Sequence, residues 1–487
     1  MKLTVIIILI PVMVVWSCSR FVDAPKNADI QPPIFPDYCN VVVPVNIAPL
    51  NFKLLEDAER LIAIIEGTSE TIRITGRNKI LFPEKKWRKL LKKNSGGSLI
   101  VTLYAHIEGT WKKYKSFNIF IKEEPVDPWI VYRLIAPGYE TWSEIGIYQR
   151  NLATFVQEPI INNRLLTHDC MNCHSFRANN PDEMMFHLRG DNGGTILVRH
   201  GNAVKLNTKV KETISNCVYP FWHPSGDFIV FSVNNIQQVF HSVKEKRIEV
   251  FDSRSDIVVL DIRSNKLITS EIISSDESFE TFPTFTPDGK CLIFCSAKKG
   301  VQPDEYNKIR YSLCSISFDA SSGSFGDKID TLVSSNLTGK SVSFPRVSPD
   351  GRILVFTLSD YGNFSIWHRE ADLYQLDMTN GEFNPVDPVN STEAESYHSW
   401  SSNSRWMIFS SRKMDGLYTR PFISYVSIDG TFSKPFMVPQ KNPDFYDDMM
   451  RSFNLPEFIT GKVKTNGREM LKTIEGPHKV VKFELKD

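Results

Sequence analysis

A fourfold repeated pattern constrains the fold of this 487-residue chain more than any other feature. Each copy starts with an aromatic residue, passes through a tight turn and ends in an apolar strand; the copies are YPFWHPSGDFIVFS (219–232), FPTFTPDGKCLIFCS (282–296), FPRVSPDGRILVFTLS (344–359) and YHSWSSNSRWMIFSS (397–411). Their turn residues, Gly226, Gly289, Gly351 and Ser404, follow one another at steps of 53 to 63 residues. In the Pro-Asp-Gly form of this turn, proline presets φ, aspartate caps the turn and glycine accepts a positive φ. Each copy therefore predicts two antiparallel strands with a tight connection.

Two further strands are expected after each copy, for example 256–261 with 266–270, and 372–377 with 382–388. Four antiparallel strands recurring at this period are typical of propeller blades. Two more blades are predicted upstream. Residues 147–152 mirror 373–378, which predicts one blade over 129–160. Another fits 168–209, with strands at 183–189 and 195–199. We therefore expect an all-β chain with a six-bladed β-propeller over 129–440.

The Pro-Asp-Gly turn before an apolar strand resembles the WD-like repeats of TolB-like propellers, over about 310 residues. The resemblance implies the fold and not the function. It departs from the pattern where Ser402-Asn403-Ser404 replaces the turn triplet and where 168–209 lacks the triplet. Peptidases with such a propeller carry a hydrolase domain as well. Here no Gly-x-Ser-x-Gly motif occurs, and the 47 residues of the C-terminal extension 441–487 are too few for that domain.

The N-terminus predicts export. Lys2 precedes an uncharged run over 3–16, which suits a signal peptide and is too short to span a membrane. The run ends in Val15-Trp16-Ser17-Cys18, which resembles a bacterial lipobox, so residues 1–18 are interpreted as a lipoprotein signal peptide with Cys18 as the lipidated residue. An ordinary secretory signal with an incidental cysteine is the alternative. Ser19 after the cysteine resembles lipoproteins sorted to the outer membrane.

Two regions separate the signal from the propeller. Residues 19–40 are rich in proline and polar residues and predict a tether. Residues 41–125 hold short β-rich stretches at 41–45, 61–65, 71–75, 98–107 and 116–122, which predict a small immunoglobulin-like β-sandwich. One helix is expected over 84–93, because Trp87, Leu90 and Leu91 recur at helical spacing.

The motif Cys170-Met171-Asn172-Cys173-His174 carries the strongest chemical signal. Two thiols at this spacing add to the two vinyl groups of one haem, and the adjacent histidine becomes the proximal iron ligand. The pentapeptide resembles the covalent attachment site of c-type cytochromes, which mature outside the cytoplasmic membrane, where the signal peptide also places the chain. The cofactor expected is covalent haem c, with His174 as an iron ligand.

Three other interpretations of the motif stay open. A zinc site would need two more ligands at comparable spacing, and a thioredoxin-type redox disulfide would need a helix after a βα unit. A structural disulfide between Cys170 and Cys173 is the third. Cys291 and Cys295 lie four apart on one expected strand, roughly 13 Å, which is beyond disulfide reach.

A second axial ligand is expected from the strand at 183–189. Alternation places Met185, His187 and Arg189 on one face and Met184, Phe186 and Leu188 on the other. His187 is the first candidate for the iron, and Met184 or Met185 the second. The more distant candidates are four histidines, two arginines for the propionates and three aromatic residues for the haem wall: His168, His200, His223, His398, Arg177, Arg189, Trp142, Phe176 and Trp222.

The formal net charge of +1 predicts no nucleic-acid partner. As a whole the chain resembles the TolB-like lipoproteins of Bacteroidetes that carry a haem motif and are often labelled cytochrome c biogenesis proteins. The resemblance implies a lipid-anchored protein of a diderm cell envelope, on the outer membrane and facing the periplasm.

Three functions follow as hypotheses. The first is electron transfer or redox sensing through one haem c, with an unknown redox or envelope protein as partner. The second is a non-redox scaffold or protein-binding propeller in which the two cysteines form a structural disulfide. The third is a haem enzyme such as a peroxidase; no catalytic residue is predicted, and a non-enzymatic role is favoured.

Overall fold

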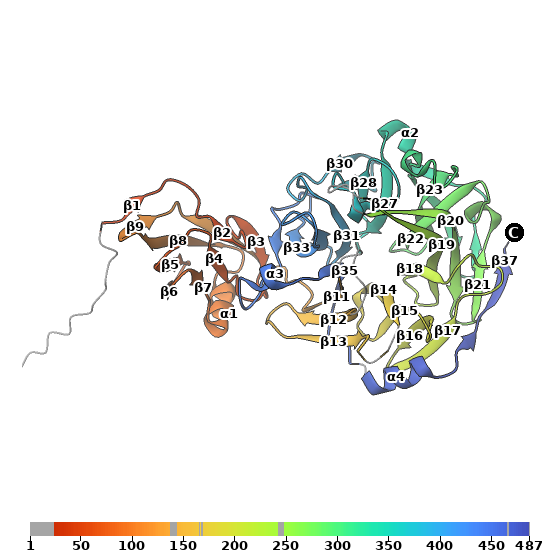
Figure 1. Cartoon of the computed structure of the whole chain (residues 1–487), viewed down its shortest axis with the longest axis horizontal. Helices are drawn as coiled ribbons and strands as arrows, with labels where there is room; N and C mark the ends of the chain where they lie inside the picture. Colours follow the sequence, from red (N-terminus) through yellow and green to blue (C-terminus); the bar gives the residue numbers. More distant parts are fainter. Residues whose placement is uncertain are drawn as a thin grey trace, which may run out of the picture.

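The structure is a computed structural model that describes residues 24–136, 144–164, 166, 169–241, 248–464 and 467–486. It is an all-β arrangement of many small sheets. A small β domain at the N-terminal end adjoins a larger body in which sheets surround a central axis (Figure 1). Among the described residues, none of the helices combines the length and the apolar content that crossing a bilayer requires. Cys18 and the signal peptide lie outside the described residues.

The N-terminal domain consists of two sheets and one helix. The seven-stranded sheet has the order β1-β9-β8-β10-β3, with β5 joined to β8 and β6 to β5, and the three-stranded sheet has the order β2-β4-β7. Their bounds are β1 Lys26–Asn27, β2 Ile34–Phe35, β3 Val41–Pro44, β4 Phe52–Leu54, β5 Arg60–Glu66, β6 Thr71–Gly76, β7 Lys79–Ile80, β8 Ser98–Ile107, β9 Thr110–Lys113 and β10 Phe117–Lys122. The expected helix is confirmed as α1 (Glu84–Lys93), with Trp87, Leu90 and Leu91 buried.

The predicted tether is wrong for its described part, residues 24–40. Strand β1 pairs with β9, and β2 pairs with β4. The Tyr38 side chain is fully buried, and its hydroxyl donates a hydrogen bond to the carbonyl of Met437 at 3.3 Å. Prolines are tolerated in short edge strands, so a proline-rich stretch with a few apolar residues packs here as part of the domain.

The larger body contains six sheets of four or five strands within the described residues, here numbered first to sixth in chain order. The first holds β11 Trp129–Ile135, β12 Gly146–Asn151, β13 Gln157–Asn162 and β35 Ser452–Ile459; the second β14 Cys170–Phe176, β15 Glu183–Arg189, β16 Gly194–Arg199, β17 Asn202–Asn207 and β36 Lys479–Val480; the third β18 Cys217–Trp222, β19 Phe228–Phe240, β20 Ile248–Asp261, β21 Lys266–Thr269 and β37 Lys482–Leu485.

The fourth sheet holds β22 Ser278–Phe285, β23 Cys291–Lys298, β24 Ser312–Asp319, β25 Ser324–Phe325 and β26 Asp330–Val333; the fifth β27 Ser341–Val347, β28 Ile353–Ser359, β29 Asp372–Asp377 and β30 Phe383–Pro385; the sixth β31 Glu395–Trp400, β32 Trp406–Ser411, β33 Arg420–Tyr425 and β34 Phe436–Met437. The remaining α-helices are α2 Ser335–Thr338, α3 Phe445–Asp448 and α4 Gly467–Glu475. This succession of small antiparallel sheets is compatible with a propeller.

The repeated turns have the predicted chemistry. The four turn residues have φ values between +60° and +80°, and each amide donates to the carbonyl three residues earlier, from 2.8 to 2.9 Å. Ser404 adopts this conformation without being glycine, at φ +60°. The turn of the divergent last copy is therefore preserved although its sequence is not.

The predicted boundary of the repeat region at residue 440 is wrong. Strand β35, from the expected C-terminal extension, pairs with β11 and becomes the innermost strand of the first sheet. Strands β36 and β37 extend the outer edges of the second and third sheets by parallel pairing. The two ends of the repeat region are thereby joined in one sheet, which closes the ring.

The N-terminal domain is packed against the sixth sheet. One apolar cluster includes Leu61 and Trp87 of the domain together with Trp406 and Phe409 of the sheet. The Trp406 indole donates to the carbonyl of Glu124 at 3.1 Å. Shared apolar packing of this kind fixes the position of one part against the other.

Candidate functional site

The six innermost strands share one backbone irregularity. Each strand's pairing with its neighbour shifts register at one place, and one residue there has a φ between 49° and 52°; these residues are Leu455, Cys173, Tyr219, Phe282, Phe344 and Tyr397. A β-bulge of this kind bends the strand and redirects the side chain. Proline follows four of the six residues, and His174 and His398 follow the other two.

Aromatic residues at these bulges close the central channel. The ring centroids of Tyr219 and Phe282 lie 4.4 Å apart, those of Phe282 and Phe344 4.2 Å, and those of Phe344 and Tyr397 4.8 Å. The channel is thereby divided into two cavities. One, the aromatic cavity, is lined by residues that follow the bulges, and the other, the arginine cavity, by bulge residues and those that precede them.

The predicted haem motif lies on β14, with its second cysteine at the bulge. Cys173 is buried beside the aromatic closure and lines the arginine cavity, while Cys170 is partly exposed and lies 3.3 Å from the Asn172 amide nitrogen. Both thiols are free, so the alternative of a structural disulfide between them finds no support here. His174 occupies the position that proline fills in four other innermost strands.

His174 is buried toward the first sheet. Its ring packs edge-on against Phe176, and neither ring nitrogen makes a hydrogen bond of regular geometry within the described residues. Burial, with a smaller contribution from Arg133, lowers the pKa of His174 to about 3, although the backbone of Leu455 and Val131 offsets part of the effect. The imidazole is therefore neutral at physiological pH.

The expected alternation on β15 is confirmed, and it separates the iron-ligand candidates. Met184 packs in the cluster shared with the first sheet, whereas Met185 packs in the cluster shared with the third sheet. His187 lies on the same face as Met185, with Nδ1 3.3 Å from Thr195 Oγ1. His174 and His187 thus lie on opposite faces of the second sheet and cannot ligate one iron from its two sides.

The described residues do not fit a haem held between these side chains. The thiols are free, and neither His174 nitrogen makes a hydrogen bond of regular geometry among the described residues, although the backbone of Val131 and Leu455 lies close enough to act on the ring. However, the face of His174 is filled by packed side chains of the first sheet, and Met184 is on the same wall as His174. Within the described part of the chain, no group of three or more His, Cys, Asp or Glu side chains is placed to hold a metal ion.

The more distant candidates also have other partners. Arg177 pairs with Glu183, and His200 lies 3.8 Å from the same carboxylate. His223 is hydrogen bonded to the Gly289 carbonyl at 3.0 Å. His398 bonds to the Val355 carbonyl at 2.8 Å, Phe176 and Trp222 line the aromatic cavity, and Arg189 lines the arginine cavity. His168 and Trp142 lie outside the described residues.

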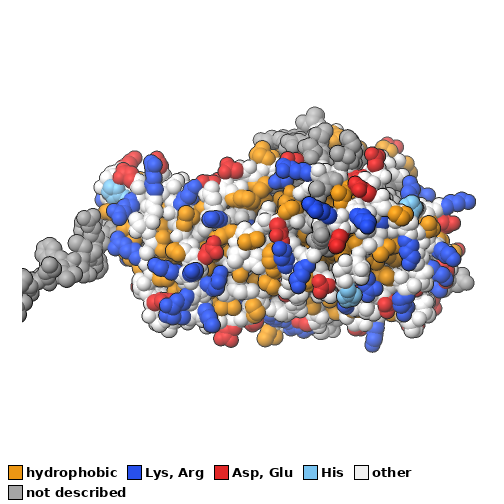
Figure 2. Space-filling view, turned by 90° about the horizontal axis from the view of Figure 1, so that it is seen from below, with side chains coloured by type: hydrophobic (Ala, Val, Ile, Leu, Met, Phe, Trp, Pro, Cys, Tyr) orange, Lys and Arg blue, Asp and Glu red, His pale blue; other side chains and the backbone are white. Residues whose placement is uncertain are grey.

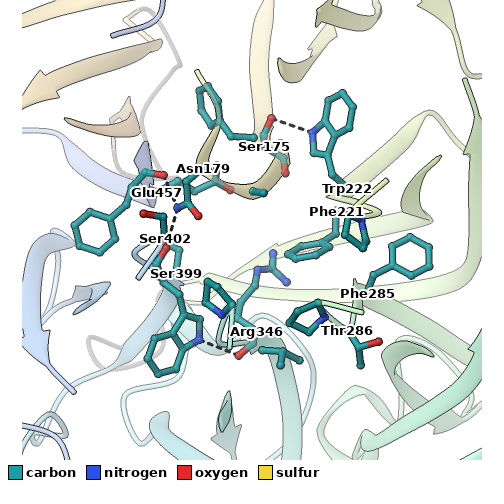
Figure 3. A pocket seen from close by; sticks show the side chains of 18 residues that line it. Ser175, Asn179, Phe221, Trp222, Phe285, Thr286, Arg346, Ser399, Ser402 and Glu457 are labelled. Carbon is teal, nitrogen blue, oxygen red and sulfur yellow. Dashed lines mark hydrogen bonds between the residues drawn. The ribbon is translucent and has the colours of Figure 1, made fainter. Parts of the chain in front are cut away.

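The aromatic cavity, of about 260 Å³, is the first candidate site (Figure 3). Its walls hold Phe221, Trp222 and Trp400, together with serine and asparagine side chains. Both indole N–H groups brace neighbouring strands: Trp222 donates to the Ser175 carbonyl at 3.3 Å and Trp400 to the Arg346 carbonyl at 3.1 Å. The indoles therefore present rigid apolar surfaces to the cavity.

Two ionisable side chains line this cavity. The Arg346 guanidinium points into it, 5.2 Å from the Phe221 ring centroid, and no ion pair within 4.0 Å joins it to a carboxylate of the described residues (Figure 3). Burial lowers the pKa of Arg346 to about 10 and raises that of Glu457 to about 8. At neutral pH the cavity therefore holds a charged guanidinium beside a largely protonated carboxyl.

Sequence reasoning missed Arg346 and Glu457. Both lie two residues after a bulge, in the pairs Phe344-Arg346 and Leu455-Glu457. An alignment of the six innermost strands would have placed both residues at the same position of the repeat, two residues after the bulge. That alignment requires β35 to be recognised as a repeat strand. The available signal is its Leu455-Pro456 pair, because proline also follows the bulge residue in three other innermost strands.

Comparison with known proteins gives only distant likenesses. No family model and no curated protein matches the sequence. Among solved structures, an oligogalacturonate lyase in complex with manganese is 13% identical, over 63% of this chain and 73% of its own, with a TM-score of 0.37. A DUF4784 family protein from Bacteroides caccae is 9% identical, over 72% of this chain and 94% of its own, with a TM-score of 0.31. At these scores the description of the fold rests on the sheet topology.

Proposed function

We propose that the chain is a non-enzymatic binding protein of the cell envelope, and that its six-bladed propeller holds a segment of a partner protein in the aromatic cavity. The observation that carries the proposal is Arg346, a guanidinium that lines the aromatic cavity and has no carboxylate within ion-pair distance among the described residues. An unpaired cation out of bulk water forms strong charge-assisted hydrogen bonds with an incoming anion. We infer that the bound segment inserts an acidic side chain or its terminal carboxylate.

The side chains that line the aromatic cavity determine which residues can flank the acidic group in the bound segment. Phe221, Trp222 and Trp400 offer apolar surface around Arg346. Rigid aromatic residues around one desolvated charge are typical of the centre of protein interfaces. A volume of about 260 Å³ accommodates one or two side chains, so the rest of the partner would lie outside on the surrounding loops. We expect an acidic residue next to an aliphatic or aromatic one.

The test is a binding measurement with paired peptides. Fluorescent peptides with Leu-Asp or Phe-Glu centres are titrated against the same peptides with Asn or Gln. Acidic peptides should bind at least tenfold more tightly, and Arg346→Gln should abolish the difference. Arg263→Gln is the matched control, because this arginine is half exposed in the turn between β20 and β21. Equal binding of acidic and amide peptides would contradict the proposal.

The same proposal includes a lipid anchor at Cys18, behind an immunoglobulin-like domain that lies nearest to the membrane. Residues 24–125 contain 16 Lys and Arg against 11 Asp and Glu, and Lys and Arg side chains are prominent on the face of this domain in Figure 2. Six of the ten residues of α1 are basic and exposed. Such a surface supports a position next to anionic lipid headgroups. The proposal also places the chain on the outer membrane of a diderm envelope, facing the periplasm; Ser19 supports the outer membrane, because it resembles the residue after the lipidated cysteine in lipoproteins sorted there.

Cell fractionation tests the anchor. The native chain should sediment with membranes and should carry a lipid on its N-terminal peptide in mass spectra. Cys18→Ala should move the chain to the soluble periplasmic fraction, whereas Cys39→Ala should not, since Cys39 is buried in the N-terminal domain. Sedimentation of the Cys18→Ala chain with membranes would contradict the anchor.

Covalent haem c, with electron transfer or redox sensing, is the second candidate. It is favoured by the motif at Cys170–His174 and by the two His174 nitrogens without regular hydrogen bonds, and opposed by the packing around His174. The pyridine haemochrome spectrum of chain matured with the c-type assembly machinery decides between the candidates. Colour that is lost in the Cys170→Ala/Cys173→Ala variant would establish the haem, and a colourless product would remove it.

A further inference from the structure

We propose that the arginine cavity is a binding site for a small polyanion, a compound with two or more carboxylate or phosphate groups. This inference is independent of the peptide proposed for the aromatic cavity, because the aromatic closure separates the two. The cavity has a volume of about 250 Å³ and is lined on different sides by Arg133, Arg189 and Arg412.

The three arginines have no neutralising partner in the cavity. The lining contains no Asp or Glu, and within the described residues none of the three guanidinium groups lies within 4.0 Å of a carboxylate. The Nε atoms of Arg133 and Arg412 are buried and have no hydrogen-bond partner there. Two buried donors without partners, beside three positive charges, are the arrangement that an anion would satisfy.

Arg412 is the best-positioned of the three. Its guanidinium stacks on the Trp367 ring, 4.2 Å from the centroid, which fixes the plane of the fork. Burial lowers the pKa of Arg412 to about 10, so it stays charged at neutral pH. A stacked guanidinium is pre-organised for a bidentate contact and loses little side-chain entropy on binding.

The apolar side chains around the arginine cavity strengthen its contacts with an anion, and its volume limits the size of the ligand. The hairpin β19–β20 contributes Ile236 and Val250 to the lining, and Phe364 and Trp367 contribute further apolar surface. A low-dielectric wall strengthens each charge–charge contact. The volume lies below the range of about 300–1,000 Å³ usual for drug-sized ligands, so we expect a compact ligand.

Isothermal titration of the full mature chain at low ionic strength tests the site, with pyrophosphate, citrate and acetate as probes. We expect pyrophosphate, citrate or both to bind at least tenfold more tightly than acetate. The stronger of the two identifies phosphate or carboxylate as the source of the charge. Binding should weaken as salt is added, because the contacts are electrostatic.

Two variants locate the binding. Arg412→Gln and Arg133→Gln should each weaken the better polyanion at least tenfold, and Arg254→Gln, a half-exposed arginine on β20, should not. The midpoint of thermal unfolding controls for folding: it should stay unchanged or rise, because each change removes a half-buried charge that has no ion-pair partner among the described residues. Arg346→Gln should leave polyanion binding intact, which separates this site from the peptide site.

Two results would overturn the inference. One is the lack of binding of both polyanions at millimolar concentration to the folded native chain. The other is binding that Arg412→Gln and Arg133→Gln leave unchanged, since the polyanion would then occupy another surface.

Discussion

At the bulges of the innermost strands, one position accepts several residue types and the next position accepts few. The residue with positive φ varies from cysteine to tyrosine, whereas the next residue is proline in four innermost strands and histidine in two. Proline has no N–H, so this position requires no backbone donor in those strands. The burial of His174 and His398 is therefore a property of the repeat, whatever else either histidine does.

We expect His174→Pro to keep the fold. Its ring makes no regular hydrogen bond among the described residues, and the backbone position accepts proline elsewhere. The thermal midpoint should change by only a few degrees. His398→Pro should cost about 1 kcal/mol more, because His398 loses its bond to Val355. Ser175→Pro is the control, since it interrupts the ladder opposite Met185 and should cost about 3 kcal/mol. A His174→Pro chain less stable than Ser175→Pro would refute this interpretation.

Glu457→Gln should stabilise the chain at alkaline pH. Burial raises the pKa of Glu457 to about 8, so the native state binds its proton more tightly than the unfolded chain does. The stability from this proton is present below the unfolded pKa and is lost as pH rises through about 8. The thermal midpoint of the variant should exceed that of the native chain increasingly from pH 5 to 9. Glu382→Gln, on an exposed side chain, should show no such trend.

Among the elements, β35 joins the two ends of the repeat region. It supplies the innermost strand of the first sheet, and Phe453 packs against Tyr132 of β11 with ring centroids 4.9 Å apart. Phe453→Ala should lower the free energy of unfolding by about 3–5 kcal/mol, as for other buried aromatic residues. Denaturant unfolding measures the change. Leu485→Ala on the outer strand β37, where the side chain is half exposed, should cost under about 1 kcal/mol. Similar costs for both changes would argue against closure by β35.

Local elements could be read from the sequence, and long-range pairings could not. Helix α1 and strands β8, β15 and β29 begin and end where their periodicity predicts. The turn at Ser404 also follows the repeat despite its altered residues. The pairing of β35 with β11 joins segments more than 300 residues apart, and neither carries a signal for the other. For the same reason the sequence predicts a tether over residues 24–40, although β1 and β2 pair with strands further along the chain.

The candidate site shows the limit of motif reasoning. The spacing of Cys170, Cys173 and His174 predicts haem attachment when it is taken alone. Aligned with the other innermost strands, Cys173-His174 matches Tyr219-Pro220 and Tyr397-His398, which predicts a bulge. Haem attachment and a β-bulge are thus both predicted from the same residues. Only the alignment of the innermost strands in three dimensions shows that Cys173 and His174 lie at the bulge.

For the molecule as a whole, buried ionisable groups predict an acidic optimum of stability. Burial raises the pKa of five carboxyls to between about 6 and about 8, namely Asp252, Asp256, Glu280, Glu395 and Glu457. Their contribution is lost as pH rises through those values. Burial lowers the pKa of three histidines to about 3, namely His174, His187 and His398, and their contribution is lost as pH falls below about 6.5.

The thermal midpoint should therefore be highest near pH 5–6 and fall on both sides. Differential scanning calorimetry from pH 3 to 9 measures the profile. A thermal midpoint that is still rising at pH 8 would show that the carboxyls with raised pKa do not determine the stability at alkaline pH.

The order in which strands leave the ribosome or the export channel matters for a ring closed by two strands far apart in the sequence. Strand β11 emerges more than 300 residues before its partner β35. Until then the first sheet presents an open edge of unpaired N–H and C=O groups, the kind of edge that recruits other chains. Ring closure therefore has to wait until β35 has been synthesised, and a chaperone that shields an exposed strand would be most useful during that interval.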